Sequence, residues 1–596
     1  MKTDNLARPI ISSEDKQPPP TALLAPPAAP MKNAPSDNPF DLIDKIFQAH
    51  LGQMTSGISP AALMISYCAW LSQLAQSPGR MLELAFYPVV HWQGSTNKAL
   101  DSDHPAHEAD PRFKGEDWQH FPWNFWAESF YQAENWWRRA TTELPGLPKP
   151  AERTVSFIAR QMLDMMSPSN LVATNPDLFN ETIRTGGGNL IHGVQSAIED
   201  MQRNASGKPA PGFETFEVGK NMAITPGRVV FRNHLIELIQ YEPQTKTVYK
   251  EPVLMVPAWI MKYYILDLSP NNSLVNWLVK QGHTVFMVSW RNPDAVDRDL
   301  RMDDYYRLGA MAAIDAISSI MPKIDIHLMG YCLGGTLAII TASAMAGNGD
   351  KRLKSLTMLA AQADFTEAGE LMLFITESEV AFLKNMMWEK GYLDGKQMEG
   401  TFQLLQSKDL IWSKMVHDYM MDKRRGVIDL LAWNADATRM PYKMHSEYLE
   451  KLFLHNDFVE GRFAVEGQWV APESVKLPVF SVSTEKDQIA PWKSVYKIHL
   501  IAPCEDITFV LTSGGHNAGI VSEPGHKGRS YYIHKTVSGA PYLAPDRWLE
   551  VAQPKQGSWW LDWHEWLAER SDKEKISSQP IGKGLCAAPG TYVLQK

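Results

Sequence analysis

The chain has 596 residues, of which 44% are hydrophobic and 21% are charged, and its formal net charge is −9. This length is too great for one ordinary core and predicts two domains with tails. Because no basic excess is present to neutralise phosphates, the composition excludes a general nucleic-acid-binding protein.

Three further features of the composition indicate where the chain works. The first 36 residues are polar and rich in Pro and Ala, which predicts a disordered leader and not a signal peptide. The most apolar stretch, residues 61–75, is interrupted by polar side chains and falls short of the roughly 18 unbroken apolar residues of a membrane span. Four cysteines are too scattered for a disulfide framework or a metal cluster and favour a reducing cytoplasm: Cys68, Cys332, Cys504 and Cys586.

Residues 37–219 have the pattern of a helical N-terminal domain. A helix begins at Asn38-Pro39, and its apolar residues recur near every 3.6 positions up to Leu51. Aromatic side chains, five of them tryptophan, crowd residues 117–138 and form either the core of this domain or a surface for an apolar material or partner. Further helices are expected over residues 60–76, 124–143, 152–166 and 189–201.

Residues 220–596 alternate between apolar strands and helices, as in a parallel sheet that helices cover on both faces. Between about residues 369 and 467 the alternation gives way to helices rich in Met, Phe, Leu and Trp. A helical insertion at this point of such a sheet predicts a lid over a site. Strands are expected over residues 229–231, 237–241, 253–257, 284–290, 324–329, 356–359, 479–483 and 507–511, and helices over 274–281, 303–319 and 336–346.

The strand over residues 324–329 runs into Gly330-Tyr331-Cys332-Leu333-Gly334-Gly335, and a helix of small residues follows. A strand, a tight turn flanked by glycines and a helix form the nucleophile elbow of the α/β-hydrolase fold, which holds one side chain at a strained point above the sheet. Here that side chain is Cys332. A thiolate exchanges readily with thioesters, so Cys332 is predicted to be the nucleophile, with a buried structural cysteine as the alternative.

An elbow needs a base and an orienting acid, which this fold supplies later in the chain in the order nucleophile, acid, histidine. Asp487 follows one late strand, and His516 follows the next within a glycine-rich turn. We therefore expect Asp487 to orient His516, which takes the proton of the Cys332 thiol. Glu485 competes with Asp487 for the role of the acid, and His526 competes with His516 for that of the base.

A thioester carbonyl also needs an oxyanion hole. The backbone N–H of Leu333 is the expected first donor, and a second is expected at Ala258, after the strand over residues 253–257. The segment Thr185–Gly188 lacks the spacing of a phosphate loop and is expected to be a turn. One acidic loop shows no ordered metal-ligand spacing, so we expect it to be solvated and the chain to hold no metal: Asp101, Asp103, His104, His107, Glu108 and Asp110.

With these residues in place, the chain resembles the class I poly(3-hydroxyalkanoate) synthases, single-subunit members of the α/β-hydrolase superfamily, from about Asn38 to the C-terminus. The resemblance includes the elbow and several longer strings, which are more specific than the elbow alone. These strings cover residues 167–170, 174–176, 256–268, 288–293, 431–438, 557–563 and 588–593.

The resemblance implies an acyltransferase that joins (R)-3-hydroxyacyl units, short ones such as 3-hydroxybutyryl, from coenzyme A (CoA) into a polyester. It implies that Cys332 carries the growing chain, that His516 activates the thiol and that Asp487 helps to deprotonate the attacking 3-hydroxyl. CoA is then part of the substrate and a product, and no cofactor is expected. Two departures concern contacts with CoA or the lid: Gln488 follows Asp487 where the family often has histidine, and Gln406-Ser407-Lys408-Asp409 replaces an Arg-Pro-Asn-Asp run.

The resemblance also implies a cytoplasmic homodimer attached to polyester granules, where granule-associated proteins can join it. Three alternatives stay open: a thioesterase, a dienelactone-hydrolase-like esterase, which also carries cysteine on an elbow, and a catalytically idle granule-coating protein. The helical N-terminal domain and the lid argue against the small dienelactone-hydrolase-like proteins. The ordered set of Cys332, Asp487 and His516 argues against an idle coat.

Overall fold

The computed structural model describes residues 39–55, 58–99, 110–395, 397, 398, 400, 407–424 and 426–596. The predicted leader over residues 1–36, residues 101–108 of the acidic loop and Gln406 lie outside these residues. In the described part, helices occupy the chain up to Thr215 and the first strand begins at Gly227. None of the described helices is long and apolar enough to cross a bilayer.

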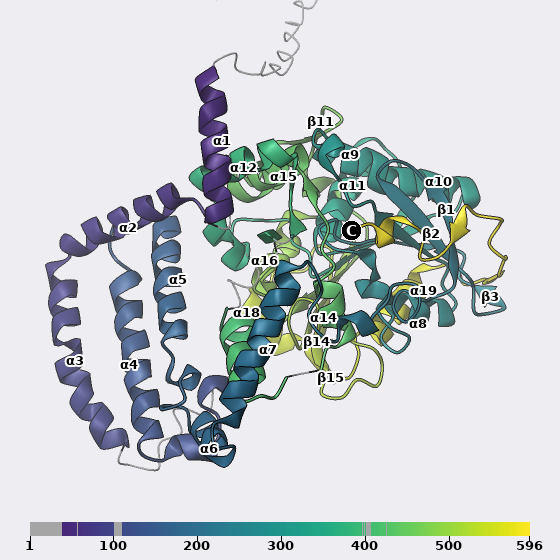
Figure 1. The fold of residues 1–596 in the computed structure, drawn as a ribbon. Coiled ribbons are helices and arrows are strands. Elements are labelled where there is room, and N and C mark those ends of the chain that lie inside the picture. The colour runs from purple at the N-terminus through teal and green to yellow at the C-terminus, as the bar shows by residue number, and fades with distance from the viewer. Residues whose placement is uncertain are drawn as a thin grey trace, which may run out of the picture. The chain divides into compact units, whose positions relative to one another are not determined.

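Helices α3, α4 and α5 of the N-terminal region lie side by side, and α2 runs across their ends (Figure 1). Of these, α3 contains Pro88 in its interior, and because proline normally ends a helix the sequence pattern did not predict it. The short α6, also not predicted, begins at Asn175, whose side chain accepts hydrogen bonds from the N–H groups of the first turn. The helices are α1 (Pro39–Met54), α2 (Pro60–Ala75), α3 (Pro78–Ala99), α4 (Trp123–Thr141), α5 (Lys149–Met165), α6 (Pro176–Arg184) and α7 (Gly188–Ala205).

The aromatic cluster over residues 117–138 divides between the interior and the surface. Trp118 is 2% exposed and packs with Phe113 and Phe130 in a small core. Phe121 and Trp126, by contrast, are 71% and 40% exposed. The core interpretation is therefore confirmed for part of the cluster, and the interpretation as a surface for an apolar material or partner stays a prediction.

One sheet of eleven strands organises the rest of the chain, in the order β15-β14-β13-β12-β7-β6-β4-β5-β2-β1-β17. The six central strands, from β13 to β5, run parallel. The strands are β1 (Gly227–Arg232), β2 (Ile236–Tyr241), β4 (Val253–Val256), β5 (Val285–Trp290), β6 (Ile326–Tyr331), β7 (Leu353–Leu359), β12 (Val479–Thr484), β13 (Asp506–Thr512), β14 (Ser530–Val537), β15 (Gln553–Gln556) and β17 (Cys586–Ala587).

The expectation of a parallel sheet is wrong at both edges, where the strands pair antiparallel. Only residues 233–235 join β1 to β2, which is too few for the crossover that a parallel pair needs, so the two strands form a hairpin. Helices pack around the sheet (Figure 1): α8 (Leu274–Lys280), α10 (Ala312–Ile320), α11 (Leu333–Gly347) and α19 (Trp560–Arg570).

The insertion between β7 and β12 is mostly helical, as predicted, but two short antiparallel strand pairs interrupt it. Its helical segments are η9 (Gly369–Phe374), α12 (Glu377–Lys390), η10 (Lys408–Trp412), η11 (Met415–Met420), α14 (Asp429–Asn434), α15 (Tyr442–Tyr448) and η12 (Leu449–Leu454). The strand pairs are β8 (Tyr392–Leu393) with β9 (Met440–Pro441), which are far apart in the sequence, and β10 (Phe463–Val465) with β11 (Gln468–Val470), which form a hairpin. We refer to residues 369–467 as the lid.

A buried carboxylate joins the lid to the start of α2. The backbone N–H of Ser59 donates to both carboxylate oxygens of Glu379, at 3.0 and 2.9 Å, and the Glu379 residue is 3% exposed. Burial raises the pKa of Glu379 from its ordinary 4.5 to about 7, although the hydrogen bond from Ser59 opposes this shift. The folded protein therefore binds a proton here at a pH at which the unfolded chain has released it.

We expect this carboxylate to make stability depend on pH. Because the folded pKa lies above the unfolded one, its contribution is complete below pH 4.5 and is lost as the pH rises through 7. The loss is up to roughly 3 kcal/mol. Melting curves at pH 5 and pH 7.5 test this expectation. The melting temperature of Glu379→Gln, relative to that of the wild type, should be higher at pH 7.5 than at pH 5. Glu377→Gln, at an exposed position of the same helix, should show no such difference, and equal pH dependence in both variants would contradict the assignment.

Candidate active site

The turn between β6 and α11 has the geometry of a nucleophile elbow. Cys332 has φ 52° and ψ −123°, a left-handed conformation that side chains other than glycine adopt rarely. Its N–H donates to the carbonyl oxygen of Leu359 in β7, at 2.8 Å, which ties the turn to the neighbouring strand. The residue is 9% exposed and lies at the N-terminus of α11.

Close backbone approach explains the glycines around Cys332. A Cβ at Gly334 would lie 2.0 Å from the carbonyl oxygen of Val256, at the end of β4. A Cβ at Gly330 would lie 2.3 Å from the carbonyl oxygen of Gly334. Both distances are shorter than any real contact, and the atoms approached belong to the backbone, so the turn can form only where these side chains are absent.

Gly334→Ala should therefore destabilise the protein by about 3 kcal/mol, because the backbone of β4 or of the elbow must move to admit the methyl group. Gly347, at the far end of the same helix, has open space around its missing Cβ. Gly347→Ala should leave stability within about 1 kcal/mol of the wild type. The shift of the urea unfolding midpoint measures both, and similar shifts for the two variants would show that the close approach is not what requires Gly334.

Asp487 and His516 come together at the carboxyl ends of β12 and β13. The Nδ1 atom of His516 lies 2.7 Å from Oδ2 of Asp487. The other carboxylate oxygen, Oδ1, accepts the N–H groups of Ile489 and Ala490 at 2.9 and 2.8 Å. Thr484 donates its hydroxyl to Oδ2 at 3.2 Å. The carboxylate is buried and fixed from several sides, so it can hold the imidazole in one orientation.

The imidazole of His516 interacts with Asp487 and with Cys332. Burial alone lowers the pKa of His516, but the charge of Asp487, the sulfur of Cys332 and hydrogen bonds to both outweigh burial and raise the pKa well above its usual value. A second link holds the histidine loop against the elbow, since the Tyr331 hydroxyl donates to Oδ1 of Asn517 at 2.5 Å. The structure thus brings the three predicted side chains together.

The competing residues lie elsewhere. Glu485 is exposed, and His526 pairs with Glu523 at 2.8 Å on the surface. Of the other cysteines, Cys504 is buried, and burial raises the pKa of its thiol to about 12. Cys68 is exposed on α2. Neither Glu485 nor His526 reaches the group formed around Cys332.

The backbone N–H groups of Leu333 and Ala258 are the predicted oxyanion donors, and this role stays a prediction. Leu333 opens α11, so its N–H has no acceptor within the helix. The approach of Gly334 to Val256 and Pro257 brings this helix end against the loop that carries Ala258. Within the described ranges, no acceptor is found for the N–H of Leu333 or of Ala258. Both donors therefore remain available to a ligand near Cys332.

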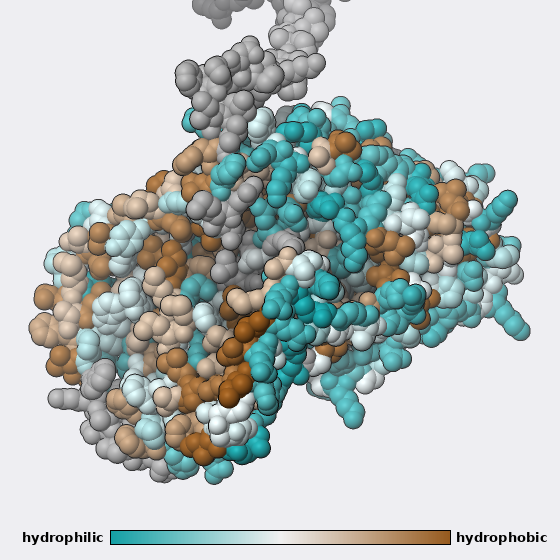
Figure 2. Space-filling model, in the orientation of Figure 1, coloured by the Kyte–Doolittle hydropathy of each residue, from teal (hydrophilic) through white to brown (hydrophobic). Residues whose placement is uncertain are grey.

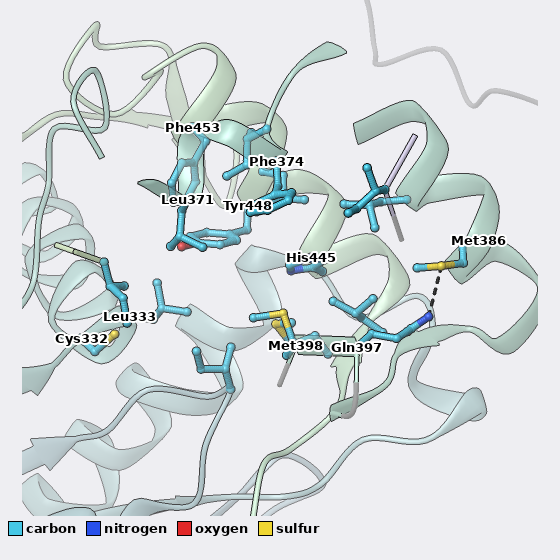
Figure 3. A pocket seen from close by; sticks show the side chains of 18 residues that line it. Cys332, Leu333, Leu371, Phe374, Met386, Gln397, Met398, His445, Tyr448 and Phe453 are labelled. Atoms are coloured by element: carbon cyan, nitrogen blue, oxygen red, sulfur yellow. Dashed lines mark hydrogen bonds between the residues drawn. The ribbon is translucent and has the colours of Figure 1, made fainter. Parts of the chain in front are cut away.

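An apolar cavity of about 100 Å³ opens at Cys332, between the sheet and the lid (Figure 3). Its residues come from segments far apart in the sequence. In Figure 3, Cys332 and Leu333 lie at one end, Met386 lies at the other, and His445 lies between them. The lining comprises Ile58, Ile260, Cys332, Leu333, Leu371, Phe374, Ile375, Leu383, Met386, Leu393, Gln397, Met398, Met440, His445, Tyr448, Leu449, Phe453 and Ile489.

The polar groups of this cavity were not predicted from the sequence. Tyr448 is 6% exposed, and burial, followed by the nearby charge of Cys332, raises the pKa of its hydroxyl well above the usual value. His445 precedes it on α15.

Gln488, one of the departures from the family pattern, is exposed, and its carbonyl oxygen accepts the N–H of Glu370 in the lid at 3.3 Å. No local signal in the sequence marks the lid residues, because their role depends on how the lid covers the elbow.

Where the structure describes the chain, no three His, Cys, Asp or Glu side chains are grouped so that they could hold a metal ion. Residues 251–523 match the family described as "alpha/beta hydrolase fold". The mixed sheet, the elbow and the later acid and histidine agree with that match. Fold and site together define an α/β-hydrolase with cysteine on its elbow, and the predicted fold class is confirmed.

Further comparisons narrow this class. Residues 38–80 and 109–278 match families described as "Poly-beta-hydroxybutyrate polymerase N terminal" and "Poly-beta-hydroxybutyrate polymerase (PhaC) N-terminus". The chain is 40% identical over 515 residues to the poly(3-hydroxyalkanoate) polymerase of Methylorubrum extorquens, which covers 85% of this chain and 84% of that protein. It is 35% identical over 520 residues to the poly(3-hydroxyalkanoate) polymerase subunit PhaC of Cupriavidus necator. This alignment covers 85% of this chain and 86% of that protein. The chain belongs to the poly(3-hydroxyalkanoate) polymerase family.

Proposed function

We propose that this chain polymerises (R)-3-hydroxyacyl-CoA, with 3-hydroxybutyryl-CoA as a substrate, into polyhydroxyalkanoate polyester and releases CoA. One observation carries the proposal: Cys332 interacts with the Asp487–His516 pair and also lines an apolar cavity beneath the lid. An acyl group on the sulfur would lie in this cavity. Because the cavity excludes water, it favours transfer of the acyl group over hydrolysis. Membership of the polymerase family supports this activity.

In the first step, the sulfur of Cys332 attacks the thioester carbonyl of the substrate. Nε2 of His516 accepts the thiol proton, while Asp487 holds Nδ1–H. The N–H groups of Leu333 and Ala258 stabilise the negative oxygen that forms. The new Sγ–C bond remains, the bond from carbon to the sulfur of CoA breaks, and the proton passes from His516 to the departing thiolate.

In the second step, the 3-hydroxyl of an incoming 3-hydroxyacyl-CoA attacks the acyl group on Cys332. An oxoester bond forms, the Sγ–C bond breaks, and the hydroxyl proton returns through His516 to the sulfur. The extended chain, now on CoA, reloads Cys332 by a repeat of the first step. Each cycle converts a thioester into a more stable oxoester, so the reaction needs neither nucleotide nor cofactor.

The contacts of Asp487 favour an indirect role in this second step. Two backbone N–H groups saturate Oδ1, and His516 and Thr484 occupy Oδ2. No free, exposed carboxylate oxygen faces the cavity, since the Asp487 side chain is fully buried. We therefore assign removal of the hydroxyl proton to His516 and the orientation of His516 to Asp487, whereas the resemblance implied that Asp487 helps directly.

The N-terminal helices supply a surface that fits attachment to a polyester granule in the cytoplasm. Apolar residues gather over them on the face shown in Figure 2. They include Met162, Met165, Met166, Ile183, Ile191, Val194, Ile198 and Met201, each at least 49% exposed. We propose that this surface attaches to the granule, alone or with granule-associated proteins, and that the protein acts as a homodimer, which sedimentation would test.

The products of purified protein and 3-hydroxybutyryl-CoA test the proposed function. We expect stoichiometric release of CoA together with an insoluble polyester of 3-hydroxybutyrate. A thioesterase, the second candidate, would release the same CoA but leave only free 3-hydroxybutyrate. Recovery of the free acid without polymer would therefore contradict the polymerase and favour the thioesterase.

A further inference from the structure

The lid presents one imidazole to the cavity, and the mechanism above does not use it. His445, on α15, is 4% exposed and belongs to the cavity lining. In Figure 3 its ring lies between Cys332 and the far end of the cavity. An acyl group attached to Sγ that extends into the cavity would pass this ring.

Neither ring nitrogen of His445 has a partner among the described residues. Nδ1 is buried and makes no hydrogen bond, and Nε2 makes none with a described residue either. The imidazole is neutral, because burial lowers the pKa of His445 to about 4. A neutral imidazole carries one donor and one acceptor, and leaving both unused in an apolar site is unfavourable. Such a group is expected to find its partner on a ligand.

The residues around His445 indicate which chemical groups the ligand contains. The neighbours in the cavity are almost entirely apolar, among them Met398, Met440 and Leu449. They accommodate the hydrocarbon part of an acyl chain. The imidazole, in contrast, matches an uncharged oxygen that can pair with one ring nitrogen, whether that nitrogen donates or accepts. A hydroxyl group on an otherwise apolar acyl chain has this chemistry.

We propose that His445 hydrogen-bonds the 3-hydroxyl of the acyl group bound in the cavity and so selects 3-hydroxyacyl thioesters over unsubstituted ones. A site built to bind a hydroxyl rejects the analogue that lacks it, because the polar group of the site is then left unpaired. This inference rests on the proposed transfer of the acyl group to Cys332. His445 does not exchange protons with the reacting atoms and acts only by positioning.

Single-turnover acylation with two substrates tests the proposal. The rate of CoA release is measured with 3-hydroxybutyryl-CoA and with butyryl-CoA, which differs only in lacking the hydroxyl. His445→Leu should slow the first reaction about 10-fold and leave the second within about 2-fold of the wild type. If butyryl-CoA reacts too slowly for its rate to be measured, its inhibition constant is measured instead, with 3-hydroxybutyryl-CoA as the substrate. That constant is then compared between His445→Leu and the wild type.

Two further variants separate binding from packing. His445→Gln keeps a donor and an acceptor and should restore part of the preference for the hydroxylated substrate. Met444→Leu, an apolar exchange of similar size on the same helix but outside the cavity lining, should leave the preference unchanged. The melting temperature of His445→Leu should not fall, since the substitution removes an unpaired buried polar group.

The outcomes are distinguishable. Equal slowing of both substrates by His445→Leu would show that the ring only supports the lid, and wild-type rates with both substrates would show that it binds no hydroxyl. Either result overturns the proposal while leaving the polymerase function intact. Failure of the wild-type protein to release CoA from 3-hydroxybutyryl-CoA would instead contradict the proposed function itself.

Discussion

Cys332→Ala should abolish both polymer formation and acyl transfer, reducing CoA release from 3-hydroxybutyryl-CoA at least about 1000-fold. The methyl group of alanine cannot form the thioester, and the elbow offers no second nucleophile. The fold should survive, because the substitution removes only one sulfur atom. The strain at Cys332 lies in its backbone conformation, and alanine adopts that conformation as well as cysteine does. The assay measures CoA release against the uncatalysed background.

The other cysteines provide matched controls for this prediction. Cys504 is buried and does not line the cavity. Sγ of Cys586 accepts a hydrogen bond from Nη2 of Arg232 on β1, at 3.4 Å. Cys504→Ala and Cys586→Ala should therefore keep most of the activity. Comparable losses in all three variants would mean that the elbow is not where the acyl group is carried.

Asp487→Asn should lower the rate of polymerisation by about 1000- to 10,000-fold while the protein stays folded. The reason lies in the contacts of the carboxylate. Oδ1 accepts two backbone N–H groups, so the asparagine must keep its oxygen there and turn its NH₂ group toward His516. Nδ1 must then accept a hydrogen bond, which places the proton on Nε2, toward Cys332. In that tautomer the imidazole cannot take the thiol proton.

The pH dependence of this variant checks the argument. Loss of the Asp487 charge removes the main interaction that raises the pKa of His516. We expect residual acylation of Cys332, still detectable over long incubations, to increase with pH as hydroxide from the solvent replaces His516 as the base. Glu485→Gln, at the exposed carboxylate two residues earlier, should behave as the wild type. A wild-type rate for Asp487→Asn would contradict the orienting role, and complete failure to acylate at any pH would place Asp487 in the chemistry of the first step.

Local signals in the sequence were sufficient for the elbow and its partners. The glycines at 330 and 334 are required by backbone approaches of 2.3 and 2.0 Å, which is why they flank Cys332 so closely in the sequence. Asp487 and His516 could be predicted because parallel strands place the loops at their carboxyl ends side by side. The catalytic roles of these three residues and the division between residues 37–219 and 220–596 stay predictions.

The parts that were missed depend on long-range packing. Strand β14 escaped prediction because it lies toward an edge of the sheet, and polar residues such as His534 and Lys535 interrupt its apolar pattern. The cavity draws on residues as distant as Ile58 and Ile489. Since no short segment contains more than a part of it, the position of His445 in the same cavity as Cys332 could be found only from the folded chain.

The central claim is that Cys332 carries the growing polyester, and the covalent adduct tests it most directly. The protein is mixed with 3-hydroxybutyryl-CoA, quenched in acid within the first turnovers and digested. The mass of the peptide that contains Cys332 is then measured by mass spectrometry. We predict that this peptide gains one or more 3-hydroxybutyryl units, which hydroxylamine removes as expected for a thioester. Polymer formation with an unmodified Cys332 peptide, or with the units on another residue, would contradict the account.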